Sequence, residues 1–385
     1  MTRFCVCLLA LVFLQNLSQA ATPTVTLIQE TASVKVMIGD DVFAVYHYGH
    51  DRKKPFFLPI SGPGGFELLK QAVATEKPGQ IGRKVVVASE SVTLKGENGP
   101  GSTVKQGEIL EISEIEGNQL HLAGKPEWIS RKDIVPVAAL VVRLINDAPA
   151  PTTDVINGDK YDHVHHKGLW FAVDQLNEHE HWGEKSLIRN QSVKLEGSGT
   201  SAAKIHVVNH WLDDDEKPLM TETSTITLTP DRFITYDAQL ASAVDDLHLG
   251  DTKEGMLAIR MAGSMREDRS GGPVVSAEGV KTSDANWGKP ARWIDYDGII
   301  DGHVFGIAIM DSPKNPWPSR YHVRNYGLFA LNPFGAGAYT AKTDHPEPKH
   351  DRHLKKNESL HFTFGVWIHG ANVTPDQVEA MYKKL

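Results

Sequence analysis

The sequence predicts an all-β protein built around a large antiparallel β-sandwich. Apolar and polar residues alternate, or form short β-branched runs, in the segments 34–48, 202–212, 223–240, 303–311 and 360–370. A period of two is typical of strands with one buried face. Glycine, asparagine, aspartate and proline separate these segments, and helical patterns are scarce. Many strands with few helices favour a sandwich over a parallel α/β sheet.

The N-terminus has the pattern of a secretory signal peptide over residues 1–20. Arg3 precedes an apolar run from 4 to 14, and small residues follow at 18–20. Both cysteines of the chain, Cys5 and Cys7, lie inside this segment. The mature protein is therefore expected in the periplasm or secreted, without disulfides, thiolate nucleophiles or cysteine metal ligands.

Composition excludes two classes of partner. No later segment approaches the ~18 consecutive apolar residues of a spanning helix, so no membrane span is expected after signal cleavage. The formal net charge is −8, and the chain has no block of lysine and arginine. Nucleic-acid binding therefore lacks its electrostatic basis.

The remaining elements follow in chain order. Residues 65–74 have a helical pattern, and the block 78–137 has four or five short strands separated by turn signals. Pro230 and Asp231 predict a hairpin between two strands of the sandwich. The tail 374–385 predicts a helix, with Thr374 as its cap and Pro375 at the first helical position.

The block 78–137 resembles a bacterial SH3-like small barrel. The resemblance rests on "GEILEISEIEGNQLHLAGKPEWISRKDIVP", with its Trp-Ile motif and Val-Pro exit. It implies a small barrel inserted into a main sandwich domain formed by 21–77 and 138–385. Barrels of this kind are commonly adaptors, which makes the cell wall a candidate partner of this block.

Long motifs of the main domain resemble a family of exported bacterial proteins of unknown function, DUF6807-like, which often carries the label methane oxygenase. The motifs are "FFLPISGPGG", "DHVHHKGLWFA", "GDTKEGMLAIRMAG", "NWGKPARWIDYDG" and "MDSPKNPWPSRYHVRNYGLFALNPFG". The methane label conflicts with this chain, because a membrane subunit of such an oxygenase needs several spanning helices. In the family, "PISGPGG" leads quite soon into the histidine motif, which supports the interpretation of 78–137 as an insertion.

The stretch "YDHVHHKGLW" at 161–170 is the densest group of chemically active residues. In an extended strand, His163 and His165 point to one face and His166 to the other. A His-x-His pair commonly begins a metal site, so a divalent metal held by His163 and His165 is one alternative. Because alternation separates His166 from the other two, we expect the three histidines to divide their duties.

Proton transfer is the preferred interpretation, and no cofactor is predicted. Histidine titrates near neutral pH, and a neighbouring carboxylate can orient or pair with it. The predicted catalytic residues are His165, His166, Glu254 and His322.

The residues around these histidines indicate a carbohydrate or another polyhydroxyl small molecule as ligand. Tryptophan faces stack on sugar rings, and arginine or asparagine side chains bond hydroxyls or a carboxylate. The predicted ligand-binding residues are Asp162, Lys167, Trp170, Asp251, Lys253, Arg260, Trp287, Trp293, Arg320, Arg324 and Asn332. We expect His165 or His166, Glu254, Arg260, Trp293, Arg320 and His322 to converge on one cleft.

These features lead to three hypotheses of function. A large β-sandwich with histidines, carboxylates and aromatics resembles the sugar-mutarotase supersandwich, where a histidine is the general acid and a glutamate the general base. The first hypothesis is an exported carbohydrate-active enzyme, a hydrolase, lyase or epimerase. The second is a non-catalytic glycan- or cell-wall-binding protein tethered by its SH3-like block. The third is a metal-dependent enzyme built on His163 and His165.

Overall fold

The computed structural model describes residues 23–69, 83–136, 163, 165–270 and 272–385, except for 88, 90, 97–98, 107, 117–118 and 131–132. The predicted signal peptide at 1–20 lies outside the described residues. The same holds for Asp162 and for the connections on both sides of the predicted insertion.

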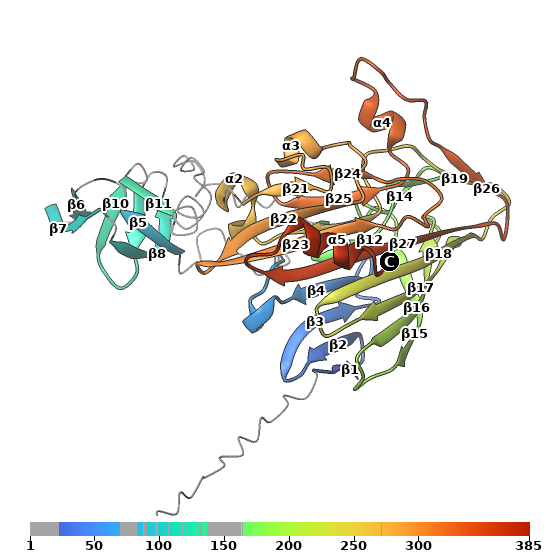
Figure 1. The fold of residues 1–385 in the computed structure, drawn as a ribbon, viewed down its shortest axis with the longest axis horizontal. Helices are drawn as coiled ribbons and strands as arrows, with labels where there is room; N and C mark the ends of the chain where they lie inside the picture. Colours follow the sequence, from blue (N-terminus) through green and yellow to red (C-terminus); the bar gives the residue numbers. More distant parts are fainter. Residues whose placement is uncertain are drawn as a thin grey trace, which may run out of the picture.

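Two eight-stranded antiparallel sheets form the main body, which confirms the predicted all-β fold (Figure 1). The first sheet has the order β1(Val25–Gln29), β2(Ser33–Ile38), β3(Asp41–His47), β4(Phe56–Ile60), β12(Leu169–Phe171), β20(Leu257–Arg260), β25(Leu328–Asn332) and β24(Arg320–Val323). The second sheet has the order β15(Ile188–Glu196), β16(Ala203–Leu212), β17(Pro218–Leu228), β18(Phe233–Ser242), β27(Ser359–Gly370), β23(His303–Asp311), β22(Trp293–Ile300) and β21(Val274–Ser276).

The two sheets share one hydrophobic core. Phe171 of the first sheet stacks on Tyr236 of the second, with ring centroids 4.7 Å apart, and also meets Trp211 edge-on. Buried apolar residues of both sheets belong to a single cluster. The alternation of buried and less buried positions along β16–β18 is the period of two seen in the sequence. The predicted hairpin at Pro230 and Asp231 joins β17 to β18.

A small four-stranded sheet stands beside the sandwich. Its order is β14(His179–Glu180), β13(Gln175–Leu176), β19(Leu247–Leu249) and β26(Arg352–Leu354). Its strands β13 and β14 lead from the first sheet toward the second, and β19 leads back to β20. The loops on either side of this sheet carry several residues of the candidate site.

Residues 83–136 form a separate seven-stranded sheet with its own hydrophobic cluster, drawn in blue-green in Figure 1. Its order is β11(Ile134–Pro136), β5(Arg83–Val87), β8(Ile109–Glu116), β9(Gln119–Leu122), β10(Glu127–Ser130), β6(Ser91–Gly96) and β7(Gly99–Lys105). None of these strands pairs with a described strand of the other sheets.

Helices are few and short in the described part of the chain. They are α2(Glu267–Ser270), α3(Ser283–Asn286), α4(Ala336–Thr340), α5(Pro375–Tyr382) and the 3-10 turns η1(Pro63–Gly65) and η4(Gly263–Met265). The predicted tail helix is α5, and Thr374 forms a capping box with Gln377. None of the described helices is long and apolar enough to cross a membrane.

The helix predicted over 65–74 is wrong for the residues that the structure describes. Glu67 bridges Ser61, and Leu69 bridges Met261 of the first sheet. The apolar spacing that resembles a helix buries Leu68 and Leu69 from an extended segment instead. Residues 70–74 lie outside the described part.

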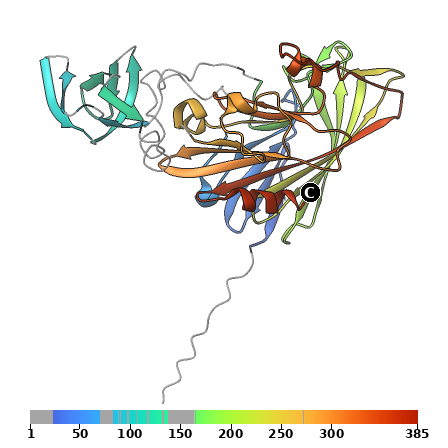
Figure 2. The same cartoon turned by 45° about the horizontal axis from the view of Figure 1, so that its top comes forward.

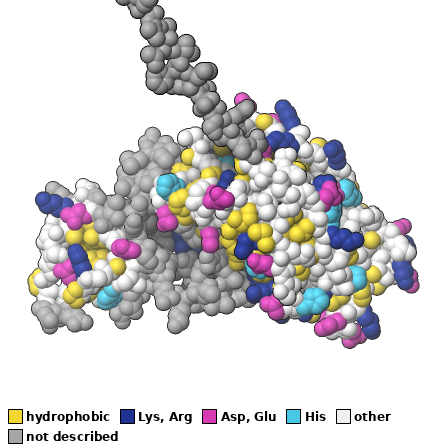
Figure 3. Space-filling view, turned by 90° about the horizontal axis from the view of Figure 1, so that it is seen from below, with side chains coloured by type: hydrophobic (Ala, Val, Ile, Leu, Met, Phe, Trp, Pro, Cys, Tyr) yellow, Lys and Arg dark blue, Asp and Glu magenta, His cyan; other side chains and the backbone are white. Residues whose placement is uncertain are grey.

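Charged side chains of both signs lie on the surface of the molecule (Figure 3). On the face shown in Figure 3, basic and acidic side chains are scattered in small separate groups, without a large field of one sign.

Candidate functional site

The three histidines lie in a turn rather than in a strand, which corrects the predicted extended geometry. His163 has a positive φ of 52°, and the His166 amide donates to the His163 carbonyl at 2.9 Å. The ring of His166 therefore stacks on His163 at 4.6 Å and meets His165 edge-on at 4.5 Å. The strand β12 begins only at Leu169, after Gly168 has turned the chain at φ 60°.

His166 is fixed as a neutral side chain. Arg260 Nη1 lies 3.1 Å from His166 Nδ1, and because arginine can only donate, Nδ1 accepts. The ring also stacks on Trp170, with centroids 5.2 Å apart. Burial, His165 and Arg260 lower the pKa of His166 far below its ordinary value. Burial, together with Lys54, also lowers the pKa of His165 to about 4.

Two charged residues that sequence reasoning missed hold this turn in place. Lys54 is 1% exposed, and its Nζ donates to the carbonyls of His165 and Trp182, both at 2.9 Å. Glu184 Oε1 lies 3.5 Å from Lys54, and Glu184 Oε2 accepts from Lys167 at 2.8 Å. Burial lowers the pKa of Lys54 to about 7, against the opposing effect of Glu184. The predicted ligand-binding Lys167 is thus paired with a carboxylate of the protein.

Strand pairing relates His322 to Trp170, which follows the histidine turn in the chain. Trp170 of β12 pairs with Ala258 of β20, Ala258 with Ala330 of β25, and Ala330 with His322 of β24. Directly paired residues point to the same face of a sheet, so Trp170 and His322 share a face. Three strand spacings separate them by ~14 Å, with two alanines between.

Tyr326 and Arg260 lie against the histidine turn. Tyr326 stacks parallel to His163 at 5.6 Å, and the Arg260 guanidinium lies 4.9 Å from the centre of the Tyr326 ring. The His163 charge also contributes to lowering the pKa of His322. The histidine turn and His322 therefore form two neighbouring polar groups near one face of the first sheet.

His322 is buried among aromatic rings. It is 5% exposed, and its Nδ1 has no hydrogen-bond partner among the described residues. Its ring meets Trp287 edge-on at 6.3 Å and Tyr339 at 6.0 Å. Burial and the charge of Arg324 lower the pKa of His322 to about 4, while a hydrogen bond with the Lys253 backbone opposes them. His322 is therefore neutral at physiological pH.

Two cations lie against the ring of Trp287, which itself contacts His322. Lys253 Nζ lies 5.4 Å and the Arg324 guanidinium carbon 5.3 Å from the centre of its ring. The buried Trp287 Nε1 and Arg324 Nε also lack a partner among the described residues. The Tyr339 hydroxyl donates to the Lys253 carbonyl at 2.5 Å, which anchors the loop that carries Lys253 and Glu254.

Two carboxyl groups in or near this loop have raised pKa values. Burial raises the pKa of Glu254, although Lys253 and Arg324 oppose the shift. Burial, followed by the charges of Glu254 and Glu180, raises the pKa of Asp174 to about 6. Asp174 was not predicted from sequence, because a single aspartate after an apolar strand gives no distinguishing signal. Carboxyl groups with raised pKa values are typical of acid–base sites.

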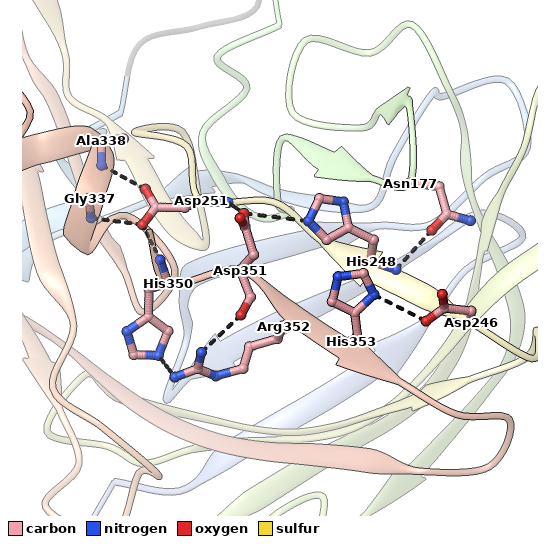
Figure 4. A network of polar contacts seen from close by, with 10 residues as sticks. All are labelled: Asn177, Asp246, His248, Asp251, Gly337, Ala338, His350, Asp351, Arg352 and His353. Atoms are coloured by element: carbon pink, nitrogen blue, oxygen red, sulfur yellow. Dashed lines mark hydrogen bonds and ion pairs between the residues drawn. The ribbon is translucent and has the colours of Figure 1, made fainter. Parts of the chain in front are cut away.

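Asp251 and Asn332 have structural roles, unlike the ligand-binding roles predicted for them. Both Asp251 carboxylate oxygens accept backbone N–H groups, from Gly337, Ala338 and His350 at 2.6–2.7 Å (Figure 4). Asn332 donates to the Thr252 carbonyl and accepts from the Phe334 amide. These bonds hold the 251–254 loop against α4 and β25, so both residues position Lys253 and Glu254.

Trp293 departs from the predicted convergence, whereas Arg320 lies near the His322 group but is bound by groups of the protein itself. Trp293 is buried in a separate cluster under α5, on the outer side of the second sheet (Figure 2), and its Nε1 donates to Glu379 at 2.8 Å. The prediction of Trp293 as a ligand-stacking residue is therefore wrong, since the C-terminal helix covers it. Arg320 lies near Tyr339, but its guanidinium donates to the Gly288 carbonyl and pairs with Glu347.

Metal-ligand geometry occurs away from the predicted histidines. Among the described residues, three potential ligand atoms within 4.8 Å of one another occur only at Asp295, Asp297 and His369 of the second sheet. They meet over Gly306, where an added Cβ would lie 2.1 Å from the His369 ring. No third ligand joins His163 and His165 within the described part, and Asp162 lies outside it.

We expect replacement of His369 by glutamine to cost ~3 kcal/mol of stability near pH 6 and much less near pH 10. Although burial alone would lower it, Asp295 at 3.0 Å and Asp297 raise the pKa of His369 to about 9. The unfolded value is near 6.5, so this stabilisation is complete below pH 6.5 and is lost as the pH rises through 9.

Urea unfolding of both proteins across this pH range, without added divalent ions, measures the difference. His361→Gln is the matched control, because His361 lies on the same strand and pairs with Asp237 at an exposed position. Equal and pH-independent losses in both variants would refute the ion-pair assignment.

The chain is an all-β sandwich protein that has buried histidines on and beside its first sheet and carboxyl groups in the adjoining loops. The sequence model of a family of unknown function, DUF6807, matches residues 145–383, and the chain belongs to this family. This confirms the family resemblance found in the motifs. The match contains the histidine turn, both carboxyl groups and His322.

Two solved structures show a distant likeness to the chain. A galactose 1-epimerase from Lactobacillus acidophilus NCFM shares 8% identity, with 91% of this chain and 99% of that chain covered, at a TM-score of 0.29. A GalM/aldose epimerase homologue from C. elegans shares 9% identity, with 91% and 100% covered, at a TM-score of 0.16. No curated protein sequence matches the chain.

Proposed function

We propose that this protein is a carbohydrate-active enzyme that performs acid–base chemistry at His322, Glu254 and Asp174. The observation that carries the proposal is the set of buried polar atoms without a partner among the described residues. Trp287 Nε1 and Arg324 Nε are donors, and neutral His322 offers Nδ1 as an acceptor. A sugar hydroxyl both donates and accepts, so a polyhydroxyl ligand satisfies all three atoms. Leaving them unsatisfied is unfavourable in a folded protein.

The titration of the carboxyl groups supports catalysis over binding alone. A general acid or base works best when its pKa lies near the operating pH, and burial raises the pKa of Asp174 to about 6. Burial also raises the pKa of Glu254, which makes its carboxylate a stronger base than an exposed one. A protonated carboxyl group and a neutral imidazole can give a proton to one sugar atom and take one from another. Hydrolysis, elimination and epimerisation of sugars all use such transfers.

His165 and His166 contribute by position in this proposal. His166 is held between Trp170 and Arg260, and His165 fixes Lys54 through its carbonyl. Burial lowers the pKa values of both histidines, so their imidazoles remain neutral. In this proposal they line the site and form hydrogen bonds. His322 and Glu254 are the residues of the predicted catalytic set that we place at the chemistry.

A glycan panel tests the proposal. Purified protein is incubated with defined oligosaccharides and glycosides, and products are followed by mass spectrometry and anomeric NMR. We expect turnover of at least one compound, and Glu254→Gln or His322→Gln should lower kcat/KM by ~100-fold or more. The folded state of each variant is checked by circular dichroism.

Glu278→Gln and His361→Gln are the matched controls, since both residues are exposed and lie outside the cluster. Binding of a glycan without any chemical change would make the protein a binder and reject the enzyme. Turnover that survives in both site variants would place the chemistry elsewhere. No binding and no turnover across the panel would reject a carbohydrate ligand.

A further inference from the structure

Lys253 and Arg324 have no carboxylate partner among the described residues, in contrast to Lys54, Lys167 and Arg320. Lys54 and Lys167 share Glu184, and Arg320 pairs with Glu347. Lys253 and Arg324 form no ion pair with a carboxylate among the described residues, and the buried Arg324 Nε has no hydrogen-bond partner there either. Partly buried cations normally have an anionic partner, because burial without one is costly.

The two cations converge from different parts of the chain. Lys253 comes from the loop between β19 and β20, and Arg324 follows β24. Both lie against the ring of Trp287, at 5.4 and 5.3 Å from its centre. The Tyr339 hydroxyl holds the Lys253 backbone, and the Arg324 amide donates to Leu328 at 2.8 Å. The protein therefore fixes two positive charges at one place beside the unpartnered Nδ1 of His322.

Glu254 offsets this positive charge only in part. It is close enough for both cations to influence it, yet it makes no ion pair with either. Two cations against one carboxyl group leave a surplus of at least one positive charge. A guanidinium with a free Nε–H and a nearby ammonium suit the two oxygens of a carboxylate.

We infer that the ligand of this site carries a carboxylate, bound by Lys253 and Arg324, and that the substrate class is an acidic sugar of the uronic acid type. The inference rests on the proposed function for the carbohydrate part of the ligand. The carboxylate occupies the place beside Trp287, and the sugar hydroxyls meet Trp287 Nε1 and His322 Nδ1. Arg324 and Lys253 are thereby assigned as the residues that determine substrate specificity.

The test compares two ligands that differ only in the carboxylate. Methyl β-D-glucuronide and methyl β-D-glucoside are titrated into the full-length protein by calorimetry at low salt, where charge interactions are least screened. We expect the glucuronide to bind at least ~10-fold more tightly than the glucoside. Arg324→Gln and Lys253→Met should each reduce this preference to less than ~3-fold, chiefly by weakening the binding of the glucuronide.

Arg292→Gln is the control, since Arg292 is half exposed, pairs with Glu379 and lies near α5. Thermal unfolding verifies that each variant is folded. Equal or tighter binding of the glucoside would overturn the inference, as would a preference that survives in both variants. If only neutral members of the glycan panel bind, the inference fails and the proposed function stands. If no member binds, both fail.

Discussion

Replacing Gly168 by alanine should destabilise the protein by ~4 kcal/mol or more, or prevent it from folding. Gly168 has φ 60°, a conformation that alone costs an L-residue ~1 kcal/mol or more. An added Cβ would also lie 2.0 Å from the Phe57 carbonyl oxygen and 3.1 Å from its carbonyl carbon. These are backbone atoms of β4, which pairs with β12 and β3 and so cannot move aside without breaking backbone hydrogen bonds.

The matched control is Gly302→Ala. Gly302 also has a positive φ, of 80°, but no atom lies within 4 Å of its added Cβ. We expect it to cost only ~1 kcal/mol. Chemical denaturation and soluble yield compare the two variants. Similar losses in both would mean that the close approach of Gly168 to β4 does not fix the histidine turn.

Replacing Glu184 by glutamine should destabilise the protein by ~3 kcal/mol at pH 6. Glu184 is the carboxylate that neutralises both Lys54 and Lys167, and the Lys54 side chain is 1% exposed. With its pKa near 7, Lys54 is charged at pH 6, so the variant would leave a buried cation without a partner. Urea denaturation at pH 6 measures the loss.

The double variant Lys54→Met/Glu184→Gln is the informative control. Removing the buried charge together with its partner should recover part of the stability lost in Glu184→Gln. Glu180→Gln is the single-site control, because Glu180 pairs with the exposed Lys185 nearby. A loss below ~0.5 kcal/mol in Glu184→Gln, or a double variant that is less stable still, would contradict the ion-pair account.

The fold was predictable because strand periodicity is local. The alternation in 202–212 and 223–240 reappears as β16, β17 and β18, and the tail signals at Thr374 and Pro375 mark the start of α5. The histidine stretch was misassigned as a strand, since a turn at His163 depends on the packing of Gly168 against β4. Sequence shows that glycine permits such a turn but not that the neighbouring strand requires it.

The site was predictable only in its chemically distinctive residues. His322, Glu254 and Trp287 stood out by type, and strand register brings His322 into line with Trp170. Lys54 and Asp174 were missed because nothing in their local sequence separates a buried charge from an exposed one. The prediction for Trp293 was wrong for a related reason: strand alternation does not show that α5 covers the sheet face on which Trp293 lies.

The pH dependence of turnover in the Asp174→Asn variant tests the acid–base site most directly. For a substrate found in the glycan panel, kcat/KM of the wild-type protein should show a limb with an apparent pKa near 6, the value to which burial raises the pKa of Asp174. In Asp174→Asn that limb should disappear and kcat/KM should fall by ~100-fold. The exposed Asp215→Asn is the control and should keep the wild-type profile. A limb near pH 6 that is unchanged in Asp174→Asn, with full turnover, would contradict the site.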